Sequence, residues 1–228
     1  MENKELSAII LAGGKGTRMR SPLPKVVHPV AGRPMIERVI KACRSAQVNT
    51  LRLVVGHGQE LVKKIVEPFN IGVFLQSQQL GTAHAVISAN PETLEGDVLI
   101  LNGDHPLVEG EDIQQFVKIF REEKATLGVV TAKVKHPRDF GRILRQKGEL
   151  KAIIEAKEAT AETLRINEIN TGIYIVKANA LKKYLPQIQN NNAKGEYYLT
   201  DLVSLCFENN EKVIAIEGNS RVAIGVNS

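Results

Sequence analysis

The first 135 residues alternate between two kinds of hydrophobic pattern. Short apolar runs rich in valine, isoleucine and leucine predict buried β-strands, and longer stretches with apolar residues three and four positions apart predict amphipathic helices. Strands of this composition that alternate with helices favour a mostly parallel sheet with helices on both faces. The expected strands are 7–13, 51–58, 71–76, 97–104 and 125–134, and the expected helices are 34–47, 60–69, 81–89 and 111–123.

The pattern changes after about residue 135. Residues 141–157 predict a hairpin that turns at Lys147-Gly148. After it we expect a strand at 170–178, helices at 179–188 and 195–210, and strands at 213–218 and 222–226. The whole chain therefore predicts an α/β fold of the Rossmann-like type. We expect one domain over residues 1–228, with a larger lobe of about 1–135 and a smaller, β-rich lobe of about 136–228.

Composition narrows the class of partner. Hydrophobic residues make up 43% of the 228 residues, which is enough for a sizeable core and argues against disorder. The net charge of +5 favours an anionic partner, either nucleic acid or phosphorylated small molecules, although an ordinary soluble surface accounts for it equally well. Because the basic residues are dispersed and aromatic residues are only 4%, we favour small phosphates and expect no nucleic-acid partner.

Two further features concern location. Cys43 and Cys206 are far apart and form no CxxC motif, so neither a disulfide framework nor a zinc site is indicated. No apolar run approaches the roughly 18 residues of a membrane span, and the first residues lack the apolar core of a signal peptide. We expect a cytoplasmic protein without a membrane partner.

A glycine-rich segment, LAGGKGTRM at residues 11–19, follows the first expected strand. Its order of residues matches neither the Walker loop nor the dinucleotide-binding fingerprint. Glycines nevertheless let successive backbone N–H groups approach an anion. Arg18 lies in this segment, and Lys25 follows a stretch stiffened by Pro22 and Pro24, which restricts its approach to a ligand. The segment therefore predicts a phosphate-binding loop.

Ligands of open α/β sheets bind beyond the carboxyl ends of the strands. Asp104 stands at such a position and suits Mg²⁺, which often takes one or two protein oxygens, although a helix cap or turn residue is the alternative. Gln76 also ends a strand, and its amide can pair with a pyrimidine edge or simply face solvent. The rule selects residues 11–19, 75–84, 101–106 and 169–172 as the candidate site.

LAGGKGTRM followed by LPKVVHPVAGRPMI resembles the sugar-phosphate nucleotidyltransferases, the pyrophosphorylases that make nucleotide sugars. VVGHG, LQSQQLGTAHAV, LNGDHPL, INEINTGIYI and NNNAKGEYYLTD look like the N-terminal uridylyltransferase domain of the bifunctional bacterial enzymes of UDP-N-acetylglucosamine synthesis. The resemblance covers nearly all of residues 7–227. It implies that the chain, with Mg²⁺ as cofactor, converts UTP and N-acetylglucosamine-1-phosphate to UDP-N-acetylglucosamine and pyrophosphate.

The resemblance also implies roles for single residues. Arg18 and Lys25 would neutralise phosphates, and Asp104 and Asn227 would hold Mg²⁺, although by composition alone Asn227 is a frayed terminus. The positions implied for uracil are Leu11, Ala12, Gly13, Gly14, Gln76, Gly81 and Thr82. The positions implied for the sugar or its surroundings are Asn102, Gly103, Gly141, Glu155, Asn170 and Thr171, with Tyr197 and Thr200 as further lining residues. Taken alone, the sugar positions equally suit turn, surface and strand-edge residues.

Two departures from the pattern matter. Asn102 stands where some relatives carry tyrosine, so sugar or ribose contacts there can differ. No hexapeptide repeats are present, so we expect no acetyltransferase activity and a monomer. A different sugar phosphate or base, and a non-catalytic module that binds nucleotide sugars, remain as alternatives. The joint presence of Arg18, Lys25 and Asp104 argues against the non-catalytic module.

Overall fold

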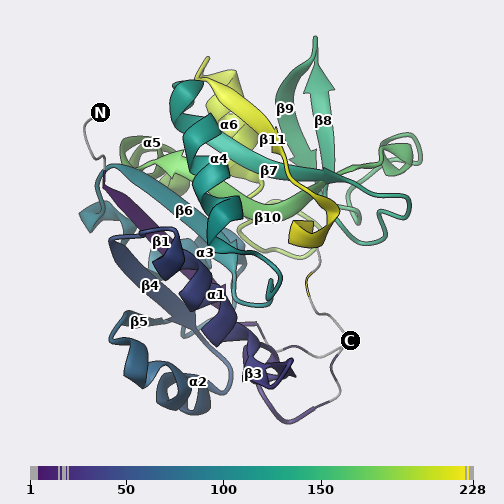
Figure 1. The fold of residues 1–228 in the computed structure, drawn as a ribbon. Helices are drawn as coiled ribbons and strands as arrows, with labels where there is room; N and C mark the ends of the chain where they lie inside the picture. The colour runs from purple at the N-terminus through teal and green to yellow at the C-terminus, as the bar shows by residue number, and fades with distance from the viewer. Residues whose placement is uncertain (1–4, 15, 17–18, 20, 224, 226–228) are drawn as a thin grey trace.

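The computed structural model describes residues 5–14, 16, 19, 21–223 and 225. Its central sheet has the strand order β11-β7-β10-β6-β1-β4-β5 (Figure 1). Neighbours on this path are parallel except β10, which is antiparallel to both β6 and β7. The strands are β1 (Leu6–Ala12), β4 (Thr50–Val55), β5 (Gly72–Leu75), β6 (Asp97–Asn102), β7 (Leu127–Lys133), β10 (Glu168–Lys177) and β11 (Val213–Glu217).

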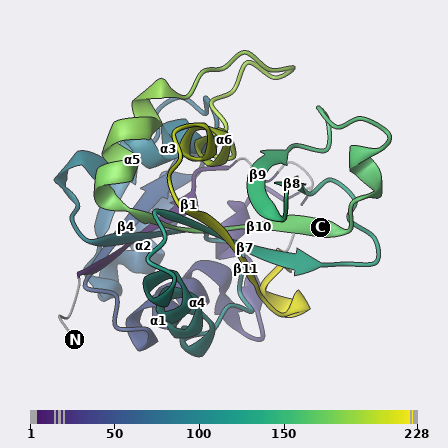
Figure 2. The ribbon, with the colours of Figure 1, turned by 90° about the horizontal axis from the view of Figure 1, so that it is seen from above.

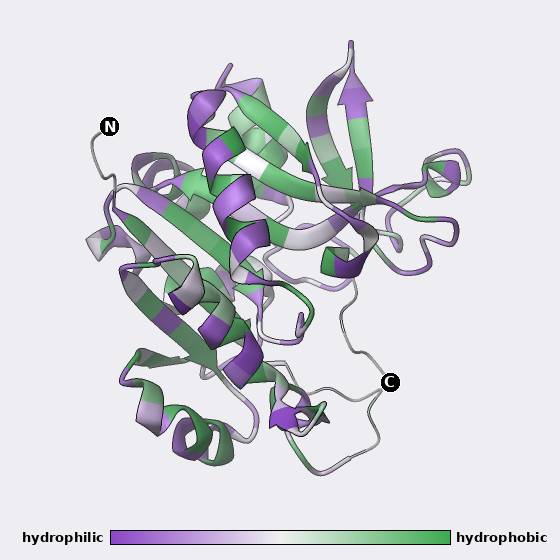
Figure 3. Ribbon diagram, viewed as in Figure 1, coloured by the Kyte–Doolittle hydropathy of each residue, from purple (hydrophilic) through white to green (hydrophobic). Residues whose placement is uncertain are grey.

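Helices cover both faces of this sheet (Figure 2). On β1, Ala8 and Ile10 belong to one apolar cluster and Ile9 to the other, so successive side chains are buried on opposite faces. The strands are therefore apolar on both faces, whereas α4 shows a hydrophilic side in Figure 3. One face carries α1 (Met35–Ser45), α2 (Gln59–Val66) and α4 (Gly110–Glu122), and the other carries α3 (Thr82–Ser88), α5 (Ala178–Tyr184) and α6 (Asp201–Glu208).

The second half of the chain completes the central sheet. Strand β10 lies between β6 and β7, and β11 lies beside β7. The predicted hairpin is confirmed as β8 (Arg142–Gln146) and β9 (Glu149–Ile154), which pair with each other off the central path. The boundary near residue 135 thus separates two parts of the chain that share one sheet, and the division into two lobes stays a prediction.

Two expected elements of the second half differ from the structure, one helix in its length and one strand in its type. The helix expected over 195–210 forms only as α6, because residues 196–199 instead run beside the segment before α3, where the Tyr197 N–H donates to the Leu80 carbonyl over 2.7 Å. The strand expected at 222–226 is a 3₁₀ helix at Ser220–Ala223 in its described part. Its turn is closed by the Val222 N–H, which donates to the Asn219 carbonyl over 3.2 Å, and Val222 is buried in the core.

Short elements connect the main ones. The antiparallel pair β2 (Pro29–Val30) and β3 (Arg33–Pro34) precedes α1. Further 3₁₀ helices within the described ranges include Lys25–Val27, Glu67–Phe69, Pro91–Thr93, Thr163–Arg165 and Leu185–Gln187. No helix in the described ranges combines the length and the apolar character that a membrane crossing requires.

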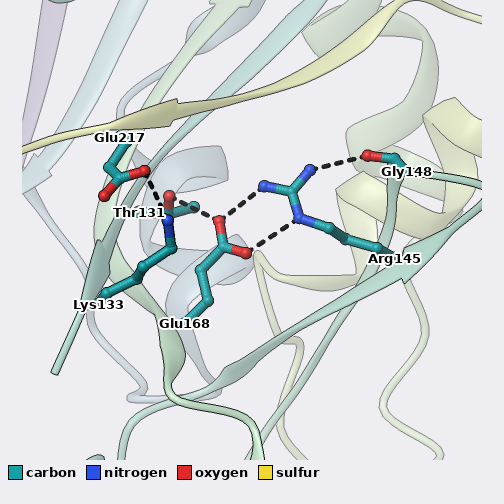
Figure 4. A network of polar contacts seen from close by, with 6 residues as sticks. All are labelled: Thr131, Lys133, Arg145, Gly148, Glu168 and Glu217. Atoms are coloured by element: carbon teal, nitrogen blue, oxygen red, sulfur yellow. Dashed lines mark hydrogen bonds and ion pairs between the residues drawn. The ribbon is translucent and has the colours of Figure 1, made fainter. Parts of the chain in front are cut away.

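A polar network fastens the β8–β9 hairpin to the sheet (Figure 4). The Glu168 carboxylate on β10 accepts hydrogen bonds from Arg145 on β8 over 2.7 and 2.9 Å and from the Thr131 hydroxyl on β7 over 2.9 Å. Arg145 also donates to the Gly148 carbonyl in the hairpin turn over 2.9 Å. Burial by itself would raise the pKa of Glu168, but the hydrogen bonds from Arg145 and Thr131 outweigh it, so this pKa is lowered.

We expect Glu168→Gln to lower the free energy of unfolding at pH 7 by about 1 kcal/mol, a modest loss because solvent screens the half-exposed Arg145. Since the folded-state pKa lies below the ordinary value of 4.5, the carboxylate stabilises the fold above that pH, and its contribution is lost as the pH falls through the folded-state value. Urea unfolding at pH 7 and at pH 3 measures both differences. Glu149→Gln, at an exposed carboxylate of the same hairpin, is the control. A Glu168→Gln deficit as large at pH 3 as at pH 7 would contradict this account.

Candidate active site

A pocket of about 340 Å³ opens at the carboxyl ends of β1, β5 and β6. Its volume is within the range of small-molecule sites. Ten of the predicted substrate-binding residues line it, and the 14 lining residues are Leu11, Ala12, Gly13, Gly14, Lys25, Val26, Gln76, Gln79, Gly81, Thr82, Ala85, Asn102, Asp104 and Glu196. The structure therefore brings together residues that are distant in the sequence, such as Leu11 and Glu196, which are 185 positions apart.

Lys25 and Asp104 form an ion pair at this pocket. Lys25 begins the 3₁₀ helix that follows Pro24, and Asp104 follows β6 after Gly103. Only 17% of the Lys25 side chain and 15% of the Asp104 side chain are exposed, so water screens the pair weakly. A cation and a carboxylate are thus held together in the lining of the pocket.

The two carboxylate oxygens of Asp104 differ. Oδ2 accepts from the Lys25 ammonium, whereas Oδ1 is buried and accepts no hydrogen bond from the part of the chain that the structure describes. A buried carboxylate oxygen without a donor is costly unless a cation or water satisfies it. Hard cations such as Mg²⁺ take oxygen ligands of this kind and complete their shell with phosphates and water. Asp104 therefore fits a magnesium ligand.

His105 lies directly behind this pair. Its ring is buried, and Nε2 is 3.8 Å from Asp104 Oδ1. Burial lowers the pKa of His105, the Asp104 carboxylate opposes this change, and Lys25 adds to it. The lowered pKa favours a neutral ring. The sequence selected residues 101–106 but indicated no role for His105 itself, because the five histidines show no ligand spacing.

Gln76 also lines the pocket. Its backbone N–H donates to the Val55 carbonyl over 2.8 Å, and its side chain is buried. The side-chain Nε2 donates to the Gly81 carbonyl over 3.1 Å and lies 3.1 Å from Nδ1 of His84. The sequence predicted Gln76 at this site but gave no indication of its contact with His84.

Residues 196–199 reach the pocket at Glu196, whereas the sequence had singled out Tyr197 in this stretch. The Ala83 N–H donates to the Tyr197 carbonyl over 2.9 Å, and the Leu199 N–H donates to the Thr82 hydroxyl over 2.9 Å. Gly81 has a φ of +115°, and a Cβ there would lie 2.4 Å from the Tyr197 carbonyl oxygen. Only glycine permits this approach, which places Glu196 at the pocket.

The predicted sugar-site residues form a second cluster. The Asn170 N–H donates to the Gly141 carbonyl over 2.9 Å, and a Cβ on Gly141 would lie 3.7 Å from Glu155 Oε1. Glu155 lines a separate pocket of about 270 Å³ together with Thr200 and Asp201. Burial raises the pKa of Glu155 and of Asp201.

The two clusters adjoin through β10. A Cβ on Gly172 would lie 2.5 Å from Nδ2 of Asn102, which lines the first pocket. Gly103 does not line that pocket but contacts it through Leu11, because the Gly103 N–H donates to the Leu11 carbonyl over 2.8 Å. The structure thus places residues 170–172 beside the lining of the first pocket at Asn102, while the role of Asn170 and Thr171 toward a sugar stays a prediction.

Two predicted residues, Arg18 and Asn227, lie outside the described residues. Within the described ranges no three His, Cys, Asp or Glu side chains are grouped so that they could hold a metal ion. A magnesium site here would therefore rely on Asp104 together with oxygens from phosphates, water or Asn227.

Residues 7–221 match the family model described as nucleotidyl transferase, so the chain belongs to the nucleotidyl transferase family. It is 61% identical over 223 residues, or 98% of its length, to the bifunctional protein GlmU of Bdellovibrio bacteriovorus. The matched part is 49% of that protein, so the chain spans about half the length of this curated relative. The resemblance found in the sequence motifs is confirmed.

Solved structures agree on the fold. A putative glucose-1-phosphate thymidylyltransferase from Bacillus anthracis superimposes with a TM-score of 0.76 at 21% identity, covering 93% of this chain and 87% of that one. A UDP-glucose pyrophosphorylase complexed with UDP-glucose gives a TM-score of 0.76 at 16% identity, covering 94% and 90%. The predicted α/β fold with a mostly parallel, helix-covered sheet is confirmed.

We expect Gly81→Ala to lower the free energy of unfolding by about 2 kcal/mol or more, because the added Cβ meets the Tyr197 backbone at a strained φ. Gly14→Ala is the matched control, since a Cβ there would have no neighbour within 4 Å among the residues that the structure describes, and its effect should stay within about 0.5 kcal/mol. Chemical denaturation of both variants measures the difference. Equal effects of the two substitutions would contradict the close approach of residues 196–199.

Proposed function

We propose that this chain is a Mg²⁺-dependent UTP:N-acetylglucosamine-1-phosphate uridylyltransferase that forms UDP-N-acetylglucosamine and pyrophosphate. One observation carries the proposal: a single pocket is lined by the Lys25–Asp104 pair, by the glycine-rich backbone of residues 11–14 and by the buried amide of Gln76, which lies against Gly13. This arrangement suits a ligand with an anionic end and a base end. The 61% identity to GlmU supports the same reaction.

The reaction requires positioning more than proton transfer. An oxygen of the sugar phosphate forms a bond to the α-phosphorus of UTP, and the bond from that phosphorus to the bridging oxygen breaks, so pyrophosphate leaves with the electron pair. The attacking oxygen is already ionised, so no general base is needed. Lys25 would stabilise the charge that develops on the α-phosphate oxygens.

The ion pair of Lys25 and Asp104 has a consequence for binding. When the triphosphate enters, the Lys25 ammonium can turn from the carboxylate to a phosphate oxygen, which leaves both oxygens of Asp104 available as ligands. Asp104 would hold Mg²⁺ with Asn227. The bound ion supplies charge neutralisation to the triphosphate and pyrophosphate.

The base and the sugar are assigned to different clusters. Gln76, Gly81, Thr82 and the backbone of residues 11–14 would bind uracil, and Gly141, Glu155 and Asn170 would bind the sugar hydroxyl groups. Glu155 and the Asn170 amide offer the acceptors and donors that hydroxyl groups need. The proposal keeps the expectation of a cytoplasmic enzyme with a nucleotide-binding and a sugar-binding lobe.

The test is pyrophosphate release from UTP with N-acetylglucosamine-1-phosphate and Mg²⁺, beside glucose-1-phosphate and beside CTP and dTTP. We expect Lys25→Gln and Asp104→Asn each to lower kcat by about a hundredfold or more, because each removes a group that offsets charge in the transition state. Lys64→Gln, at an exposed lysine on α2, is the control and should keep full activity.

Three outcomes are distinguished. Turnover with the acetylated sugar, lost in both variants, supports the proposal. Turnover only with another sugar phosphate or nucleotide would support the nucleotidyltransferase reaction but contradict the proposed substrates. Binding of UDP-N-acetylglucosamine by calorimetry without any turnover would identify a non-catalytic binding module instead.

A further inference from the structure

The side-chain amide of Gln76 has a fixed orientation. Its NH₂ group lies 3.1 Å from the Gly81 carbonyl oxygen, which can only accept a hydrogen bond. The reversed amide would bring two oxygen atoms to that distance with no proton between them. Because the side chain is only 4% exposed, water cannot relieve such a contact. The Gly81 carbonyl therefore determines which end of the amide faces it.

This orientation determines the tautomer of His84. The same NH₂ group lies 3.1 Å from His84 Nδ1, so Nδ1 must act as the acceptor. A ring that accepts at Nδ1 is neutral and carries its proton on Nε2. The ring is held in place by α3, where the Ala83 N–H donates to Tyr197 over 2.9 Å and the Ala85 N–H donates to Gly81 over 3.1 Å.

The other end of the amide faces the pocket. A Cβ on Gly13 would lie 2.9 Å from Gln76 Oε1, so this oxygen is directed at the glycine-rich segment and both residues line the cavity. With its NH₂ group engaged by two acceptors, Gln76 presents only a carbonyl oxygen to a ligand. An acceptor there suits a base edge with a ring N–H, as uracil has at N3. The N3 atom of cytosine is itself an acceptor and would face Oε1 without a proton between them.

We propose that His84 is a positioning residue for base selection: Nδ1 of its neutral ring holds the Gln76 amide so that Oε1 meets the N3–H of uracil. The inference rests on the proposed function for the identity of the base. The orientation of Gln76 and the tautomer of His84 do not depend on it. A site with a fixed acceptor rejects the analogue that lacks the donor more strongly than a site whose amide can turn.

The first test needs no substrate. Nitrogen NMR of the histidine-labelled chain reports which ring nitrogen carries the proton, and the spectrum of His84→Phe assigns the signal among the five histidines. We expect a neutral ring protonated at Nε2 and accepting at Nδ1 in the wild type. A ring protonated at Nδ1 would overturn the inference whether or not the chain turns over UTP.

The second test measures base discrimination. His84→Phe removes the acceptor and keeps a ring, so we expect KM for UTP to rise about three- to tenfold with kcat within about twofold. The ratio of kcat/KM for UTP to that for CTP should fall by a similar factor. His84→Asn places an amide oxygen near the position of Nδ1 and should recover most of the ratio. Ile87→Ala, at an exposed residue of the same helix, is the control.

The ratio of kcat/KM for UTP to that for CTP distinguishes a positioning role of His84 from a general role in folding. Equal losses for UTP and CTP in His84→Phe, with no recovery in His84→Asn, would overturn the inference. In a Gln76→Ala background, His84→Phe should cause no further loss of discrimination, because the two residues act as one unit. If the wild type releases no pyrophosphate, the proposed function fails, and the same ratio is measured as UMP against CMP binding by calorimetry.

Discussion

The parallel pairing of β1 with β4 and β6 fixes the position of the site. Its register places Ala12 beside Val55 and Leu11 beside Asn102, so the three strands end at the same level. The ladder continues beyond the strands, since the Gly103 N–H donates to Leu11 over 2.8 Å. Because both faces of these strands are buried, a one-residue shift in register would move each side chain into the opposite apolar cluster and disrupt the packing of both, so the register is specified by the two cores. The loops that follow β1 and β6 therefore leave the same edge of the sheet and lie close together at the pocket.

The antiparallel strand β10 brings the second half of the chain to the same edge. Its pairing with β7 shifts register between Asn170 and Ile173, which frees the residues between them from the regular ladder. Asn170 turns its amide to the buried Tyr174 hydroxyl over 2.7 Å and accepts from the Gly172 N–H over 2.9 Å. Gly172 in turn lies against Asn102, so one irregular stretch joins the two clusters. The Glu168 network keeps the adjoining hairpin in register with it.

The sequence predicted the parts of the site that follow from local order along the chain. Lys25, Gln76 and Asp104 were found because glycine-rich segments and polar residues at strand ends carry their own signal. His84 and His105 lie within stretches that the sequence selected, but no sequence signal indicates their contacts with the Gln76 amide and with Asp104. Glu196 was not found, because it reaches the pocket through the pairing of residues 196–199 with a segment distant in sequence. The same reason accounts for the shortened α6, whose expected first turns are drawn into contact with Leu80, Thr82 and Ala83. Sequence periodicity predicts which side of a segment is buried, but it does not predict which other segment forms hydrogen bonds with its backbone.

The most direct test of the account is a crystal structure of the chain with UDP-N-acetylglucosamine and Mg²⁺. The account predicts uracil between Gln76 and the backbone of residues 11–14, the diphosphate beside Lys25 and Asp104, and the sugar near Gly141, Glu155 and Asn170. A nucleotide bound elsewhere, for example in the cavity of about 560 Å³ beside Asp97 and Lys177 at the opposite end of β6, would contradict it.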